Sequence, residues 1–242
     1  VQIACGVILI YSGTFIHLFE NNNWNYALTI LWVVGLMNSI NMLDNMDGIT
    51  TSISLIILIV ILSVMLGHEH NPTYLTIVIG LIATLFCFLY FNWNPSKMFM
   101  GDTGSQFLGI ALAALSIHYL WNPVQNGNEF AISRQFIIPL LSFIIPIIDT
   151  TTVVIKRASK GKSPFVGGKD HTTHHLSYLG FNEKQVAIIM IMIAVVAAVM
   201  VYFIVNYIQK WTHTYTILFS GYFLLVFISL FSIAMKNRDK SN

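Results

Sequence analysis

Polar side chains interrupt an apolar stretch of the chain near residue 40, and their types could hold a cation or a phosphate. The helical repeat places on one face Asn38, Asn41, Asp44, Asn45 and Asp47. A carboxylate held close to hydrocarbon costs roughly 3 kcal/mol on insertion scales, so such residues are read as functional. The same stripe is also typical of a pore lining or of hydrogen bonds between helices. Spacing alone leaves these alternatives open.

A second polar motif, Gly101-Asp102-Thr103-Gly104-Ser105, joins two apolar segments. Its glycines permit tight backbone geometry. Asp102 and Ser105 then lie near the start of the following helix, where free N–H groups favour an anion. The carboxylate is a hard oxygen ligand that suits Mg²⁺ bound to a phosphate. A simple helix N-cap explains either residue as well.

The longest polar stretch of the chain covers residues 160–176 and is basic and rich in histidine. It contains Lys169, Asp170, His171, His174 and His175. These cations and imidazoles could bind a phosphosugar, and the loop could close over a bound substrate. A zinc site made from three histidines and one aspartate is an alternative. A basic loop that faces anionic lipid headgroups is another.

Asp149 is a weaker signal inside an apolar segment. It lies about two helical turns before Lys156 and Arg157, in the half of its segment nearer to these cations. Pairing with a neighbouring lysine or asparagine would explain it without any role at a site. Asp149 is therefore a secondary candidate.

The composition shows which elements must position these residues. Of the 242 residues, 56% are hydrophobic and 9% are charged, with a mean hydropathy of +0.72. An average soluble domain carries about 25% charged residues. The sequence therefore predicts an all-α protein, a polytopic transmembrane helical bundle that forms a single domain over residues 1–242. Windows of about 20 apolar residues, the length that crosses a bilayer core, predict about eight spans. They fall near residues 1–19, 26–43, 49–66, 73–91, 105–121, 135–155, 185–207 and 214–235.

Basic residues predict the orientation of this bundle. Alternate connections place on one side the linkers 44–49, 92–104 and 156–184 and the C-terminal tail. That side holds all of the 12 lysines and arginines except Arg134 and Lys210. By the positive-inside rule it is cytoplasmic. The aspartates of the first two motifs and the histidines of the third then share the cytoplasmic face, where they can converge.

The three motifs, taken in order, resemble those of the bacterial polyprenyl-phosphate N-acetylhexosamine-1-phosphate transferases. This superfamily includes the phospho-N-acetylmuramoyl-pentapeptide translocase. The resemblance rests on residues 41–48, 99–105 and 170–176 and spans most of the chain between residues 30 and 180. It implies that undecaprenyl or another polyprenyl phosphate attacks the β-phosphorus of a UDP-sugar such as UDP-GlcNAc. The products would be a polyprenyl-diphospho-sugar and UMP.

The resemblance also implies a setting for this reaction. The cofactor would be Mg²⁺, with Mn²⁺ as an alternative ion. The protein would lie in the bacterial inner membrane with its active site facing the cytoplasm, and would initiate a cell-envelope glycan such as an O-antigen or a teichoic acid linkage unit. Its partners would be the lipid phosphate, the UDP-sugar and the bilayer, without nucleic acid. Related enzymes can form homodimers.

Residue roles follow from position in the motifs. Asp102 matches the metal ligand of the family, and Asp44 and Asp47 match essential acidic residues near the catalytic centre. The candidates for substrate binding are Asn38, Asn41, Asn45, Asn92, Phe99, Lys169, His171, His174 and His175. The loop departs from the family's commonest His-x-His-His pattern, because two threonines separate His171 from His174.

One family motif has no counterpart here. Related proteins carry an Asp-Asp pair in a cytoplasmic loop that would precede Val1, and this sequence has no adjacent aspartates. The resemblance therefore predicts that N-terminal helices of the full protein are missing and that the 242-residue segment alone is inactive.

Two other classes of protein compete with this interpretation. A secondary transporter could carry intramembrane carboxylates, but it needs them near the bilayer centre with access from both sides. The acids here are expected on one face. An inactive scaffold related to the transferases is the other alternative, and an intact upstream Asp-Asp segment would argue against it.

Overall fold

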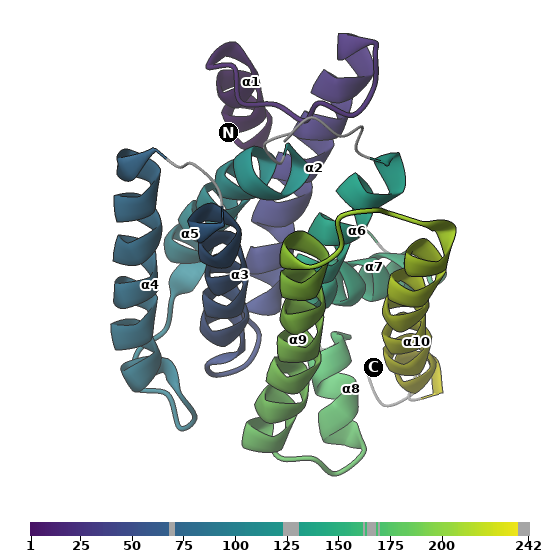
Figure 1. The fold of residues 1–242 in the computed structure, drawn as a ribbon. Helices are drawn as coiled ribbons and strands as arrows, with labels where there is room; N and C mark the ends of the chain where they lie inside the picture. The colour runs from purple at the N-terminus through teal and green to yellow at the C-terminus, as the bar shows by residue number, and fades with distance from the viewer. Residues whose placement is uncertain (68–70, 123–130, 162, 164–167, 169, 237–242) are drawn as a thin grey trace.

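The computed structural model describes residues 1–67, 71–122, 131–161, 163, 168 and 170–236, and within them every regular element is a helix (Figure 1). The first five helices are α1 (Gln2–Tyr11), α2 (Asn22–Leu43), α3 (Ile49–Leu66), α4 (Pro72–Asn92) and α5 (Gly101–Ser116). A π-helical turn, η1 (Ile117–Trp121), continues α5. The remaining helices are α6 (Ile132–Ser142), α7 (Ile144–Ala158), α8 (Thr172–Tyr178), α9 (Glu183–Asn206) and α10 (His213–Lys236). The all-helical membrane fold expected from the sequence is confirmed.

The expected count of eight spans is not confirmed. In the described residues, 5 helices are long and apolar enough to cross a membrane, namely α2, α3, α4, α9 and α10. A sixth span results if α6 and α7, which meet at an angle of 83°, are taken together. The three windows that do not give straight spanning helices are 1–19, 105–121 and 135–155.

The first of these windows gives only the ten residues of α1, because the chain turns at Gly13, whose φ of 81° is in the left-handed region. Asn25 Oδ1 accepts the N–H groups of Leu18 and Phe19, at 3.1 and 2.8 Å. Asn122 Oδ1 accepts the N–H of His17 at 2.9 Å. These bonds hold residues 17–19 in a non-helical conformation after the turn.

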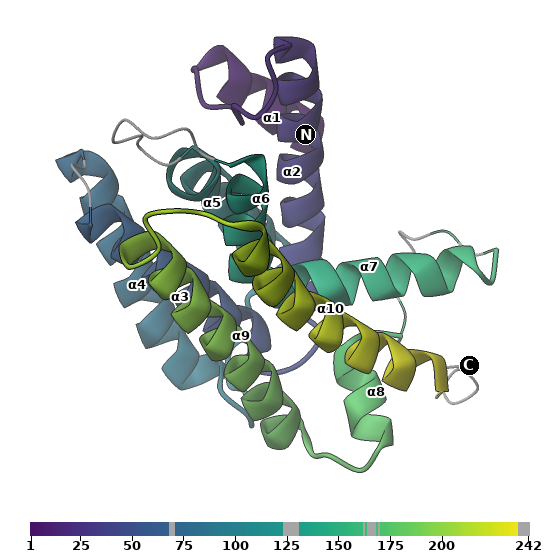
Figure 2. The same ribbon diagram turned by 45° about the vertical axis from the view of Figure 1, so that its right-hand side comes forward.

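The window 135–155 breaks at Phe143, between α6 and α7. Pro146 has no N–H to donate to the carbonyl of Ser142, and its ring would collide with that carbonyl in a continuous helix. Pro139 lies inside α6 and weakens the preceding turn in the same way. As a result α7 turns sideways out of the bundle, with α8 below it (Figure 2).

Close contact between α2 and α5 sets the centre of the bundle. A Cβ atom added at Gly109 of α5 would lie only 2.7 Å from the Cα of Met37 in α2. Only glycine allows the two backbones to approach this closely. The contact lies two helical turns from the start of α5 and therefore brings Asp102 beside the end of α2.

The polar motifs gather at one end of the molecule. The turn between α2 and α3, the segment between α4 and α5, and α8 all lie at the bottom of Figure 1. The connection from α1 to α2 lies near the opposite end, and the connection from α9 to α10 lies at the upper ends of these two helices, at about mid-height of the molecule. The structure thus brings the three sequence motifs together at one end of the bundle.

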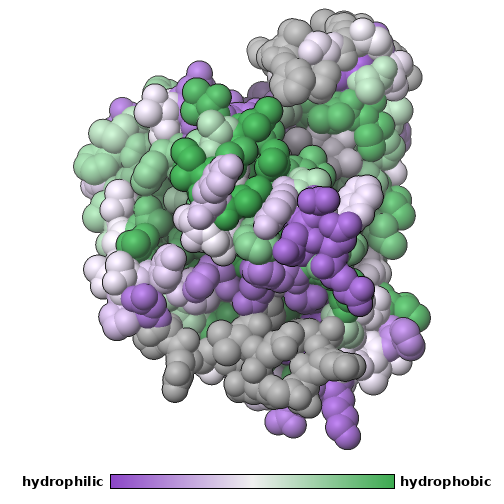
Figure 3. All heavy atoms as spheres, turned by 90° about the horizontal axis from the view of Figure 1, so that it is seen from above, coloured by the Kyte–Doolittle hydropathy of each residue, from purple (hydrophilic) through white to green (hydrophobic). Residues whose placement is uncertain are grey.

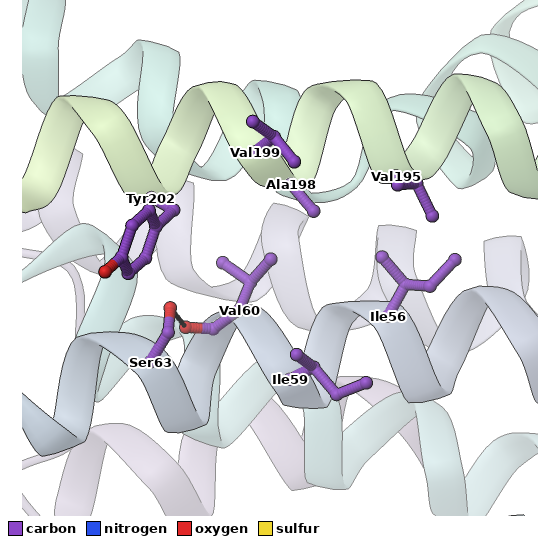
Figure 4. Close-up of a pocket in the computed structure, with 8 residues that line it drawn as sticks. All are labelled: Ile56, Ile59, Val60, Ser63, Val195, Ala198, Val199 and Tyr202. Atoms are coloured by element: carbon purple, nitrogen blue, oxygen red, sulfur yellow. Dashed lines mark hydrogen bonds between the residues drawn. The ribbon is translucent and has the colours of Figure 1, made fainter.

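Apolar side chains cover much of the outside of the bundle. Hydrophobic residues make up a large part of the surface seen from above, beside a hydrophilic band (Figure 3). A shallow groove of about 280 Å³ lies between α3 and α9 (Figure 4). Its lining is apolar apart from Ser63 and Tyr202, and Ser63 donates its hydroxyl back to the Val60 carbonyl at 2.7 Å. Such a surface suits contact with lipid.

Candidate active site

The centre of the candidate site is the contact between the end of α2 and the start of α5. Asn41 Nδ2 donates to Asp102 Oδ1 at 3.1 Å and to Ser105 Oγ at 2.8 Å. The chain then turns sharply at Gly48, whose φ of 73° is in the left-handed region that favours glycine. This turn separates the end of α2 at Leu43 from the start of α3 at Ile49, so the aspartates of the first motif lie in a short, partly buried turn.

Asp44 and Asp102 form a pair of like charges at this end. Burial raises the pKa of the Asp44 carboxyl, and the negative charge of Asp102 raises it further. The side chain of Asp102 is exposed, in the first turn of α5. Two carboxylates that repel each other beside the N-terminus of a helix favour a bound cation or a proton.

Asp47 belongs to the same turn but bonds to the segment between α4 and α5. Its Oδ2 accepts the backbone N–H of Ser96 at 2.9 Å and Nδ2 of Asn94 at 3.1 Å. Asn94 Nδ2 also donates to Oε2 of Glu183, in the first turn of α9, at 2.6 Å. Asp47 therefore ties together two of the loops that surround the site.

The asparagines of the first motif point to different partners. Asn38 exchanges two hydrogen bonds with Gln2 of α1, at 2.9 and 3.1 Å, and Gln2 Nε2 also donates to Gln106 at 3.0 Å. Asn45 Oδ1 accepts the hydroxyl of Thr173 in α8 at 2.6 Å. The first motif is thus joined to α1 on one side and to the histidine helix on the other.

Asn92 and Phe99 occupy contrasting environments. Asn92 is 3% exposed; its Oδ1 accepts the hydroxyl of Thr51 at 2.7 Å, and its Nδ2 donates to the Met98 carbonyl at 2.9 Å. This arrangement shapes the loop that carries Phe99. Phe99 is 75% exposed, so its ring is available to stack on a planar ligand. That both residues bind substrate remains a prediction.

Asp149 joins the histidine loop rather than a lysine or asparagine. It is 1% exposed, and its Oδ2 lies 2.8 Å from His171 Nδ1. Its Oδ1 accepts the backbone N–H of Thr172 at 2.8 Å and the hydroxyl of Thr172 at 2.6 Å. The secondary candidate is therefore bonded directly to two residues of the third motif.

His175 and His174 differ in exposure. His175 is fully buried, and its Nε2 lies 2.6 Å from the Nζ of Lys156, which is also buried. Burial, and then the positive charge of Lys156, lowers the pKa of His175 to about 4. In this conformation His175 is an uncharged packing residue. His174 is partly exposed on the same helix and can reach a ligand.

An ion pair closes the loop before α8. Arg157 Nε and Nη2 donate to the two oxygens of Asp170 at 2.8 and 2.7 Å. Burial alone would raise the pKa of Asp170, but the hydrogen bonds and charge of Arg157 outweigh it and hold the pKa below its usual value. Lys169, a predicted substrate ligand, lies outside the described residues.

The donors around Asp102 fit the predicted Mg²⁺ better than the alternative zinc site. Mg²⁺ typically takes one or two carboxylates together with phosphate oxygens and water. Exposed Asp102, with the charge of Asp44 close by, supplies that kind of donor set. Among the described residues, no group of three or more His, Cys, Asp or Glu side chains is arranged to hold a metal ion. His171 and His175 are instead bonded to Asp149 and Lys156.

Comparison with known proteins identifies the architecture. The model of glycosyl transferase family 4 matches residues 1–120, which contain the whole contact between Asn41 and Asp102. A "Probable undecaprenyl-phosphate N-acetylglucosaminyl 1-phosphate transferase" of Bacillus subtilis (strain 168) is 33% identical over 181 residues. The chain belongs to glycosyl transferase family 4. The family resemblance inferred from the motifs is thereby confirmed.

Other curated relatives match at similar levels. The alignment with the Bacillus subtilis protein covers 75% of this chain and 48% of that protein. A "Phospho-N-acetylmuramoyl-pentapeptide-transferase" of Limosilactobacillus reuteri (strain DSM 20016) is 31% identical, over 73% of this chain and 52% of that protein. A "Decaprenyl-phosphate N-acetylglucosaminephosphotransferase" of Mycobacterium leprae (strain TN) is 29% identical, over 77% of this chain and 50% of that protein. The chain spans about half the length of these curated family members.

Several residues that organise this family 4 site were not singled out from the sequence. They are Gln2, Asn94, Lys156, Thr173 and Glu183. Lys156 in particular was counted only as a cation of the cytoplasmic face, yet it is buried. Its position seven residues after Asp149, on the same face of α7, is the one sequence signal that could have linked it to the site.

Proposed function

We propose that the protein transfers a sugar 1-phosphate, with an N-acetylhexosamine as the sugar, from a UDP-sugar to polyprenyl phosphate. A phosphate oxygen of the lipid forms a bond to the β-phosphorus of the UDP-sugar. The bond from that phosphorus to the bridging oxygen breaks, and UMP leaves with the electron pair. The observation that carries the proposal is the convergence of Asp102, Asp44 and the histidine helix at one end of an apolar bundle.

This arrangement suits a reaction between a lipid and a soluble nucleotide. The polar end of the bundle adjoins an apolar exterior, so a phosphate on a long hydrocarbon chain can reach the carboxylates from the bilayer. The relatives named for undecaprenyl- and decaprenyl-phosphate substrates support this choice of acceptor. By the positive-inside rule, the polar end faces the cytoplasm of a bacterial cell.

The residues of the site have separate tasks in this proposal. Asp102 would hold Mg²⁺, with Asp44 close enough to share its charge, and Asn41 fixes the carboxylate of Asp102 through its hydrogen bond. The ion would neutralise the charge that builds on the diphosphate. Exposed Phe99 would stack on the uracil, and the partly exposed His174 would donate to a phosphate or the sugar. Asp47 holds the surrounding loops in place.

Asp102→Asn tests the proposal directly. The assay follows incorporation of radiolabelled sugar phosphate from a UDP-sugar into polyprenyl phosphate, in membranes that contain the full natural protein. The substitution keeps the size of the side chain but removes the charge that holds the metal, so transfer is expected to fall by roughly a hundredfold or more.

Glu20→Gln is the matched control for this experiment. It makes the same change of charge on an exposed residue of the connection between α1 and α2, a segment at the other end of the molecule, and transfer should be unchanged. If Asp102→Asn transferred sugar phosphate at the wild-type rate, the assignment of Asp102 as the metal ligand would be refuted. Membranes with the wild-type protein that release no UMP would refute the proposed function itself.

A further inference from the structure

Helix α7 holds the histidine helix α8 at two points. Asp149 and Lys156 are seven residues apart, so they lie on one face of α7 about two turns from each other. They contact His171 and His175, which are four residues apart and share a face of the α8 region. All four side chains are at least nine-tenths buried. The two contacts therefore fix both the position and the rotation of α8 relative to α7.

The contact at Asp149 also fixes the state of the His171 ring. Asp149 Oδ1 already accepts two hydrogen bonds, from the N–H and the hydroxyl of Thr172, as an ionised carboxylate would. An ionised carboxylate offers only acceptors, so the proton between Asp149 Oδ2 and His171 belongs on Nδ1. Within the described part of the chain, Nε2 of His171 has no hydrogen-bond partner. That nitrogen is the ring atom left to meet a substrate.

Asp149 also bonds to the backbone of α8, and so links the His171 ring to the start of that helix. The N–H of Thr172 is the first of α8, and no side chain of the preceding residue caps it. The carboxylate of Asp149 takes the place of this missing cap from another helix. Thr173 follows in the same turn and donates to Asn45 of the first motif. The ring of His171 is thus held in a fixed relation to the turn that carries Asp44 and Asp47.

We propose that Asp149 is a positioning residue for the transfer reaction, which holds His171 with its proton on Nδ1 and presents Nε2 to the substrate. This inference rests on the proposed function and extends it to a residue that does not itself touch the substrate. His171 Nε2 accepts a hydrogen bond from an O–H group of the substrate, either a sugar hydroxyl or a protonated phosphate. No covalent bond to the protein forms in this step.

Asp149→Asn separates this role from simple packing. The amide has the same shape and its Oδ1 can still accept from Thr172. Its Nδ2 donates where the carboxylate oxygen accepted, so His171 must turn its unprotonated nitrogen toward residue 149 and move its proton to Nε2. Transfer is expected to fall roughly tenfold to a hundredfold, mainly in kcat, because a required acceptor has become a donor.

Two measurements on the full natural protein decide the matter. The first is nitrogen NMR of the ¹⁵N-histidine-labelled protein, with the His171 signals assigned by their loss in His171→Gln. In Asp149→Asn these signals should change from the Nδ1–H to the Nε2–H tautomer. Asp170→Asn, which removes a carboxylate from the same loop, should leave the tautomer unchanged. A wild-type ring that already carries its proton on Nε2, or a tautomer that does not change in Asp149→Asn, overturns the proposal.

The second measurement is a double-mutant cycle between Asp149→Asn and His171→Gln. If Asp149 acts through His171, the double variant should transfer no more slowly than His171→Gln alone. Losses that multiply would show an independent structural role and overturn the proposal. If Asp149→Asn does not accumulate in membranes, Asp149→Glu replaces it in the cycle with the same two outcomes. A wild-type protein without transfer refutes the proposed function, and the tautomer measurement still decides whether Asp149 sets the state of His171.

Discussion

At the scale of single residues, the histidines of the third motif have distinct environments. His171 is bonded to a carboxylate, His175 to an ammonium group, and His174 is partly exposed. A run of similar residues in the sequence thus gives three imidazole rings in three different settings, of which two are buried and one is partly exposed. Each setting depends on the partner that another helix contributes.

The buried state of His175 predicts how stability depends on pH. In the unfolded chain an ordinary histidine binds a proton below a pH of about 6.5, whereas the folded protein binds one at His175 only near its pKa of about 4. Between these values protons favour the unfolded chain. The free energy of unfolding therefore contains the full contribution of neutral His175 above a pH of about 6.5. As the pH falls toward 4, the free energy of unfolding decreases by on the order of 3 kcal/mol.

Thermal unfolding of the purified protein between pH 7 and 4 measures this effect. His175→Gln should give a flatter dependence of the melting temperature on pH across this window. His213→Gln, which changes an exposed histidine, should follow the wild-type curve. Equal slopes for all three proteins would contradict the assignment of His175 as a buried neutral ring.

At the scale of helices, the approach of α2 and α5 at Gly109 controls the site. In Gly109→Ala the new methyl group would meet the Met37 backbone at 2.7 Å, so the two helices must separate by roughly 1 Å. The bond of 3.1 Å between Asn41 and Asp102 lies at the end of this contact. Transfer should fall by up to roughly a hundredfold, because displacements of this size misplace reacting groups.

Gly35→Ala provides the matched control for this substitution. Gly35 lies in α2 two residues before Met37, and a Cβ there meets open space. The radiolabel transfer assay on membranes with equal amounts of each protein compares the two variants. If Gly109→Ala retained wild-type transfer, the close approach of the helices would not be what places Asp102.

The sequence predicted some elements closely and others poorly, for physical reasons. Windows at 49–66 and 73–91 correspond to α3 (Ile49–Leu66) and α4 (Pro72–Asn92), because hydropathy alone decides such helices. The window at 135–155 was predicted as one span although the helix breaks within it. An average of hydropathy values carries no information on the backbone N–H that Pro146 lacks. The left-handed turn at Gly13 likewise ended α1 early, and a single glycine hardly changes the local hydropathy.

Some contacts of the candidate site could likewise be predicted from the sequence, and others could not. Alternating connections placed Asn41 and Asp102 on one face, and the structure brings them to 3.1 Å although 61 residues separate them. The pairing of Asp149 with His171 could not be predicted, because it depends on how the start of α8 packs against α7, 22 residues away in the sequence. Residue types and spacing indicated the right groups, and tertiary packing chose their partners.

At the scale of the whole molecule, orientation in the membrane is open to a direct test. Helix α9 has 24 residues, a length of about 36 Å, which exceeds the hydrocarbon core of a bilayer. Lys184 lies in its first turn at the polar end, and exposed Lys210 follows its other end. If the polar end is cytoplasmic, these two positions must lie on opposite sides of the membrane.

Cysteine labelling checks this prediction in cells. In a protein whose Cys5 and Cys87 are replaced by alanine, Lys210→Cys should react with a membrane-impermeant maleimide in intact cells. Lys184→Cys should react only after the cells are opened. The reverse pattern would place the carboxylates outside the cell, where UDP-sugars are not made, and would contradict the proposed donor.

Because α7 runs sideways from the break at Phe143, the position of its far end is sensitive to the angle at that break. Lys156 lies 12 residues beyond Ile144, which is about 18 Å along the axis from the break at Phe143. A rotation of about 5° at the break would therefore carry the far end through roughly 1.6 Å, more than half the length of a hydrogen bond. Two hydrogen bonds oppose such a rotation: Ser39 of α2 donates to the Pro146 carbonyl of α7 at 2.7 Å, and Thr173 of α8 donates to Asn45 at 2.6 Å. These two bonds therefore set the spacing between the histidines and Asp102 although the helix is broken at Phe143.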